Sequence, residues 1–83
     1  MIKAVVTGHS RGLGAAVAAE LVARGIPVLG LARGHAEIGE GMEQAAIDLG
    51  DAQALAAWLG GHTLRFFLAG CDTALLVNNA GVV

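Results

Sequence analysis

The stretch Thr7-Gly8-His9-Ser10-Arg11-Gly12-Leu13-Gly14 follows a short apolar run at residues 2–7 and precedes an alanine-rich segment. We expect the run to be a buried strand and residues 13–24 to be a helix that ends at Gly25. A strand that passes through glycines into a helix N-terminus brings backbone N–H groups close to a bound phosphate. The stretch therefore predicts a phosphate-binding turn, in preference to a plain turn that merely needs glycines.

Apolar runs and helical segments alternate along the rest of the chain. We expect, in chain order, a strand at 27–32, a loop at 34–44, a strand at 45–49, a helix from the N-cap Asp51 to Leu59, a helical piece at 63–69 and a strand at 73–78. Near-continuous apolar strands separated by helices are typical of a parallel sheet with helices on both faces. We therefore predict a Rossmann-type α/β fold, with residues 1–83 forming the N-terminal part of a single domain.

The composition restricts the partners of the chain. Only 14% of the residues are charged and the net charge is −2, without any basic block, so a nucleic-acid surface has no electrostatic support. No apolar run has the length of a membrane span, and we expect no targeting segment ahead of the first strand. The single cysteine, Cys71, can form no internal disulfide, which fits the cytoplasm. The histidines and Cys71 lack the spacing of metal ligands, so we predict no metal site.

The chain is more apolar than a small independent domain requires, because 55% of its residues are hydrophobic and its mean hydropathy is +0.67. In a doubly wound sheet the first and fourth strands are neighbours. A sheet that stopped after the strand at 73–78 would leave that strand with a bare apolar edge. We therefore interpret the fold as truncated after the fourth strand, with apolar faces that further chain or a partner would cover.

Three motifs together resemble the short-chain dehydrogenase/reductase family. Residues 7–14 resemble its TGxxxGxG motif, Asn78-Asn79-Ala80-Gly81 resembles its NNAG motif, and Asp48-Leu49 resembles its acidic–apolar pair after the third strand. Related sugar-nucleotide epimerases have TGxxGxxG, whereas Arg11 stands in the place of their second glycine. The resemblance implies hydride transfer between a nicotinamide cofactor and a carbonyl or alcohol substrate. It also implies a homo-oligomer for the full-length protein.

The resemblance implies roles for individual residues. Asp48 would bind the adenine amino group and the backbone N–H of Leu49 a ring nitrogen, while Asn78 would be structural. The residues along a ribose would be Asn79, Ala80 and Gly81. The residues that line the phosphates and the adenosine ribose would be Gly8, Ser10, Arg11, Gly12, Leu13 and Gly14.

The charges near the end of the second strand favour NADP(H) over NAD(H). An NAD enzyme tends to have an acidic residue there, which accepts hydrogen bonds from the ribose hydroxyls. This chain has Ala32 followed by Arg33 at that place. A planar guanidinium suits phosphate oxygens, and Arg11 can reach the same place from the glycine-rich turn. Two arginines on one 2′-phosphate would favour NADP(H) by about 1–3 kcal/mol; the alternative for each is a solvated surface arginine.

The residues that carry out proton transfer in the family are absent from this sequence. The family uses a tyrosine, a lysine four residues later, a serine and a further asparagine, all beyond the NNAG motif. This chain has no tyrosine, its only lysine is Lys3, and its only serine is Ser10 in the phosphate turn. We therefore expect no catalytic residue here and expect the substrate to bind through a missing C-terminal part.

Two alternatives to this interpretation remain. If 83 residues are the complete product, the chain would be a non-catalytic nucleotide-binding or protein-interaction module. The other alternative is an atypical reductase with altered catalytic groups.

Four residues outside the expected cofactor contacts complete the sequence-based predictions. We interpret His9 as a turn residue and not as a metal ligand. We expect Trp58, Phe66 and Phe67 to contribute to the core from helical faces.

Overall fold

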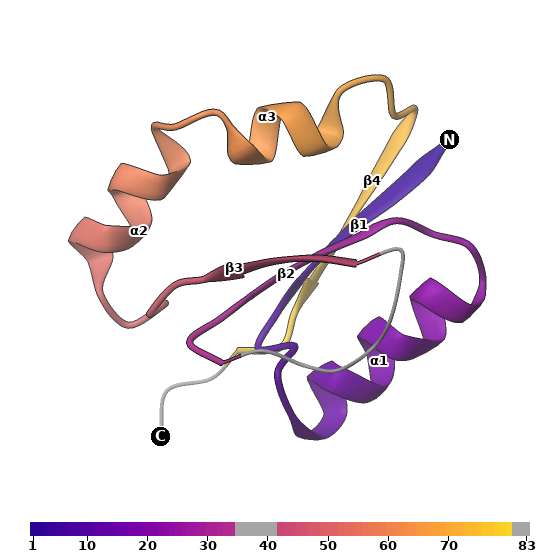
Figure 1. Cartoon of the computed structure of the whole chain (residues 1–83), viewed down its shortest axis with the longest axis horizontal. Coiled ribbons are helices and arrows are strands. Elements are labelled where there is room, and N and C mark those ends of the chain that lie inside the picture. Colours follow the sequence, from indigo (N-terminus) through magenta and orange to yellow (C-terminus); the bar gives the residue numbers. More distant parts are fainter. Residues whose placement is uncertain (35–41, 81–83) are drawn as a thin grey trace.

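The computed structural model describes residues 1–34 and 42–80 and contains a four-stranded parallel sheet with the strand order β3-β2-β1-β4 (Figure 1). Along the chain the elements are β1 (Ile2–Thr7), α1 (Gly12–Ala23), β2 (Val28–Ala32), β3 (Met42–Ala46), α2 (Ala52–Leu59), α3 (Thr63–Leu68) and β4 (Thr73–Asn78). The predicted Rossmann-type fold is confirmed, including the adjacency of the first and fourth strands.

Helices cover both faces of the sheet, with α1 on one side and α2 and α3 on the other (Figure 1). Successive side chains of a strand point to opposite faces, so β1 contributes to two cores. Val6 packs in a cluster with Ala18 of α1. Val5 packs in a second cluster with Leu29 and Phe67. The small Ala18 side chain is fully buried and lets α1 lie close to the sheet.

The helix boundaries follow from local signals in the sequence. Gly25, just past the end of α1, has a φ of 77°, a conformation that glycine adopts without strain. The carboxylate of Asp51 accepts a hydrogen bond of 3.0 Å from the backbone N–H of Ala54 and so caps α2. Both predicted boundaries are confirmed.

The third strand differs from the prediction, because it begins at Met42 and ends at Ala46, whereas we expected it at 45–49. β3 pairs only with β2 in the described sheet, so it is an outer strand and tolerates polar residues. Glu43 is exposed there, and the Gln44 side chain is hydrogen-bonded to His9. The predicted loop therefore ends before Met42, and residues 35–41 lie outside the described part of the chain.

Two of the three predicted core aromatics contribute to the core. Phe67 is buried and Trp58 packs partly against the same cluster. Phe66 is 72% exposed, so its prediction was wrong; it stacks on His62 with ring centroids 5.6 Å apart. Neighbouring residues on a helix point about 100° apart. Phe67 and Phe66 therefore cannot both face the sheet.

Lys3 has a structural role at the end of the sheet away from the glycine-rich turn. Its ammonium group donates hydrogen bonds to the carbonyl oxygens of Phe67, at 2.5 Å, and Ala69, at 3.1 Å. These carbonyls lie at the C-terminus of α3, where a positive charge is stabilising. The only lysine of the chain thus fastens α3 to β1.

Candidate cofactor-binding site

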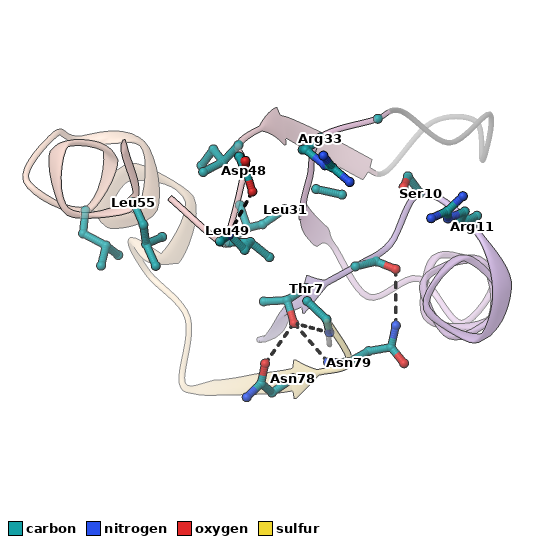
Figure 2. A pocket seen from close by; sticks show the side chains of 17 residues that line it. Thr7, Ser10, Arg11, Leu31, Arg33, Asp48, Leu49, Leu55, Asn78 and Asn79 are labelled. Carbon is teal, nitrogen blue, oxygen red and sulfur yellow. Dashed lines mark hydrogen bonds between the residues drawn. The ribbon is translucent and has the colours of Figure 1, made fainter. Parts of the chain in front are cut away.

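A pocket lies where the carboxyl ends of the strands meet, the place at which open α/β sheets bind ligands (Figure 2). Its lining comes from the glycine-rich turn, the ends of β2 and β4, the segment after β3 and the helix α2. The lining residues are Thr7, Gly8, Ser10, Arg11, Leu31, Ala32, Arg33, Gly34, Ile47, Asp48, Leu49, Gly50, Leu55, Leu59, Asn78, Asn79 and Ala80.

Thr7 joins the glycine-rich turn to the segment after β4. Its hydroxyl oxygen accepts hydrogen bonds from the backbone N–H groups of Asn79, at 3.0 Å, and Ala80, at 3.1 Å. The hydroxyl lies 3.1 Å from Asn78 Oδ1, to which it donates (Figure 2). The side-chain amide of Asn79 in turn donates a hydrogen bond of 3.3 Å to the carbonyl oxygen of Gly8. The two motifs, from opposite ends of the chain, are therefore one connected unit.

The sequence-based predictions did not include Thr7 among the site residues. The register of β1 and β4 indicates the role of Thr7, because Thr7 and Asn78 are paired as the last residues of these two strands. A threonine and an asparagine that end neighbouring parallel strands meet at the same edge of the sheet.

The first turn of α1 packs tightly against the glycine-rich turn. A Cβ atom at Gly14 would overlap the carbonyl oxygen of Gly8 and lie 2.6 Å from the Asn79 amide nitrogen. The N-cap residue Arg11 makes no side-chain hydrogen bond to the first turn of the helix. The first N–H groups of α1 therefore remain donors for an anion at the positive end of the helix dipole.

Acidic and apolar groups form the other end of the pocket. Asp48 Oδ1 accepts a hydrogen bond of 2.9 Å from the backbone N–H of Gly50. Among residues 1–34 and 42–80, Asp48 Oδ2 has no partner, so it can accept from an amino group of a ligand. Leu49, Leu55 and Leu59 supply apolar surface. The sequence-based predictions missed Leu55 and Leu59, because which face of α2 meets the pocket depends on the tertiary packing.

Two arginines flank Ser10 at the remaining side of the pocket. In the view of Figure 2, Ser10 lies between Arg33 and Arg11. The glycine-rich turn approaches the segment that follows β2, since a Cβ atom at Gly34 would lie 3.5 Å from the Ser10 hydroxyl oxygen. Ala32 is buried at the end of β2 and brings no carboxylate there. Within the described ranges neither guanidinium has an ion-pair partner.

The structure gathers most of the predicted site residues in this pocket. Those in its lining are Gly8, Ser10, Arg11, Arg33, Asp48, Leu49, Asn79 and Ala80. Gly12, Leu13 and Gly14 lie at the start of α1 beside the pocket, and the Leu13 side chain is 72% exposed, so these residues would act through their backbone. Gly81 lies outside the described residues. Cofactor contacts of these residues stay a prediction.

None of the helices in the described ranges has the length and apolar character of a membrane span. In the same part of the chain, no three histidine, cysteine or acidic side chains gather in a way that would hold a metal ion.

A parallel sheet in this order, with a glycine-rich turn at a helix N-terminus and a pocket at the strand ends, defines a Rossmann-type fold. Among solved structures, the chain is similar to a short-chain dehydrogenase/reductase from Burkholderia vietnamiensis, with 45% sequence identity and a TM-score of 0.93. The resemblance to the short-chain dehydrogenase/reductase family is thereby confirmed. The match covers 99% of this chain and 42% of that protein. No family model and no curated protein matches the chain.

Proposed function

We propose that this chain forms the cofactor-binding part of an NADP(H)-dependent oxidoreductase of the short-chain dehydrogenase/reductase type. Such an enzyme transfers a hydride between the nicotinamide and a carbonyl or alcohol substrate. The observation that carries the choice of NADP(H) is the group of Arg33, Ser10 and Arg11 at the end of β2, where an NAD enzyme tends to have a carboxylate.

The pocket offers a complementary group for each part of the cofactor. Asp48 and the Leu49 backbone would bind the adenine, with Leu55 and Leu59 as apolar walls. The first N–H groups of α1 would hold the pyrophosphate. Asn79 and Ala80, which are fixed by Thr7, would lie along a ribose. The bound nicotinamide would supply or accept the hydride, and the residues described here would orient it.

The magnitude of the preference follows from the exposure of the two arginines. Both guanidinium groups are exposed, so salt and water weaken their attraction to a phosphate. A charge-assisted bidentate contact remains stronger than a neutral hydrogen bond. We therefore expect a preference near the lower end of the range, about tenfold, or roughly 1.4 kcal/mol.

The test compares the dissociation constants of NADPH and NADH for the intact protein and for the variant Arg33→Ala. We expect the wild type to bind NADPH about tenfold more tightly, and the variant to lose most of this preference without a change in NADH affinity. Arg65→Ala is the matched control, because Arg65 is an exposed arginine on α3 outside the pocket lining. Equal affinities in the wild type, or an equal loss for both cofactors in Arg33→Ala, would contradict the charge argument.

The outer position of β4 supports a second candidate function, a non-catalytic nucleotide-binding or protein-interaction module. β4 pairs only with β1 in the described sheet, and Leu76 on it is 70% exposed. The two candidates differ in the intact mass of the protein from its native source. A mass well above 8.3 kDa supports the oxidoreductase, whereas a mass of 8.3 kDa supports the module. NADPH oxidation by the purified protein with a panel of carbonyl compounds gives the second, independent measurement.

A further inference from the structure

His9 belongs to the glycine-rich turn, yet its side chain is fully buried. The imidazole lies against Gly30 of β2, because a Cβ atom at that glycine would overlap His9 Cγ and come within 2.6 Å of His9 Cδ2. The ring therefore occupies the space that a side chain at residue 30 would fill. Met42 of β3 borders the same space.

The imidazole is also bonded to the outer strand. His9 Nε2 lies 2.7 Å from Gln44 Oε1, and since an amide oxygen can only accept, Nε2 carries the hydrogen. Nδ1 is also buried, and it has no hydrogen-bond partner in residues 1–34 and 42–80. Burying a polar atom without a partner costs free energy. An apolar side chain of similar size would avoid that cost, so packing alone does not account for a histidine here.

The turn needs an attachment at this position. Gly8 and Gly12 both have positive φ, 69° and 61°, and they enclose His9, Ser10 and Arg11. Glycine has the largest backbone freedom of any residue in the unfolded chain and loses the most on folding, so a turn between two glycines has many competing conformations. Thr7 holds the start of the turn, and the close contact of Gly14 with Gly8 holds its end. Of the three enclosed residues, only His9 has a buried side chain.

We propose that His9 is a positioning residue, which fastens the glycine-rich turn to β2 and β3 and thereby places Ser10, Arg11 and the first N–H groups of α1 to receive the phosphates of a dinucleotide. Gly30 supplies the space and Gln44 the acceptor for this attachment. The inference rests on the proposed function for its ligand, but the attachment itself is a property of the protein without a cofactor.

The test uses four variants of the intact protein. His9→Ala removes the attachment, and His9→Gln restores a donor, since its side-chain amide nitrogen can take the place of Nε2. Gly30→Ala leaves His9 in the sequence but fills its space. The fourth variant combines His9→Ala with Gly30→Ala. Two measurements apply to each: hydrogen exchange of the backbone amides at 9–14 without cofactor, and the dissociation constant of NADPH.

We expect His9→Ala and Gly30→Ala each to speed exchange of the turn amides and to weaken NADPH binding by about tenfold or more, because a misplaced binding group has a large effect. Exchange in α3 serves as the internal control for an intact fold. His9→Gln should recover part of both effects. In the double variant, the loss of binding free energy for NADPH should be much smaller than the sum of the losses in the two single variants, because the two residues share one space.

A purely structural His9 would give a different result. The variants would then lower the melting temperature, while the exchange of the turn amides and the NADPH affinity, both measured well below that temperature, would match the wild type; this outcome would overturn the proposal. Additive losses in the double variant would also overturn it. If the wild type binds no dinucleotide, the proposed function fails, and the exchange of the turn amides alone decides whether His9 fastens the turn.

Discussion

Replacing Gly14 by alanine tests the close packing between α1 and the glycine-rich turn. A Cβ atom at residue 14 would lie 2.6 Å from the Asn79 amide nitrogen and 2.8 Å from the carbonyl carbon of Gly8, besides overlapping the Gly8 carbonyl oxygen. Non-bonded atoms prefer about 3.5–4.0 Å, so the contacts with the Asn79 nitrogen and the Gly8 carbonyl carbon are short by at least roughly 0.7–0.9 Å, and the overlap with the Gly8 oxygen is larger. The neighbouring atoms are mostly backbone, which cannot rotate away as a flexible side chain would.

The size of the expected effect follows from this displacement. Overpacking costs about 1–3 kcal/mol of folding free energy. A shift of nearly 1 Å in a binding group can weaken its function by about a hundredfold. We therefore expect Gly14→Ala to be destabilised by about 2 kcal/mol and to bind NADPH at least tenfold more weakly.

The assay combines urea unfolding of the intact protein with NADPH titration at 25 °C. Gly25→Ala is the matched control, because Gly25 has a positive φ of 77° and, apart from its chain neighbours, no atom of residues 1–34 and 42–80 lies within 4 Å of its would-be Cβ. It should lose about 1–2 kcal/mol of stability through backbone strain, with unchanged NADPH affinity. Wild-type stability and wild-type NADPH affinity in Gly14→Ala would refute the packing argument. Equal losses of NADPH affinity in both variants would show that the effect is not local to the pocket.

Three further substitutions test the contacts that hold the site and the sheet together. Thr7→Val keeps the side-chain shape but leaves the N–H groups of Asn79 and Ala80 without their acceptor, so unfolding by urea should show a loss of about 1–3 kcal/mol; a loss no larger than that in the exposed control Thr63→Val would contradict it. Asp51→Ala should lower stability by about 1 kcal/mol through loss of the α2 cap, while Asp51→Asn should retain most of it. Lys3→Met should lower the stability by about 0.5–1.5 kcal/mol, with an unchanged NADPH affinity, because it removes the charge and the two hydrogen bonds at the C-terminus of α3, away from the pocket; wild-type stability would argue against that cap.

Local signals were sufficient to predict most of the fold. The run at residues 2–7 and the glycine at 25 each determine their element through nearby residues, and both were confirmed. The start of β3 was not predictable in this way, because Met42 and Gln44 belong to the strand through backbone pairing with Val28 and Gly30 of β2, and not through a local signal. Periodicity alone likewise did not show which aromatic of α3 faces the sheet, and Phe66 was therefore misplaced.

The same distinction between local and long-range signals applies to the candidate site. Motif residues such as Ser10, Arg33 and Asp48 were predicted to share one site, and the fold brings them to one pocket. Thr7 and the apolar wall of α2 were missed, because their roles depend on strand register and on helix orientation. Sequence patterns therefore gave the groups that would contact a ligand more readily than the groups that hold them in place.

The hydrogen bonds of Thr7 have a consequence for the order of folding. The Thr7 hydroxyl and the backbone N–H of Asn79 that it binds are 72 residues apart in the sequence. Contacts over such separations form late, because the entropy of loop closure must be overcome first. During synthesis β1, α1 and β2 can associate as soon as they emerge, but the phosphate-binding turn is completed only when β4 has paired with β1. A nascent chain should therefore gain affinity for a dinucleotide in a single late step, and a bound cofactor would stabilise the finished sheet without assisting its early assembly.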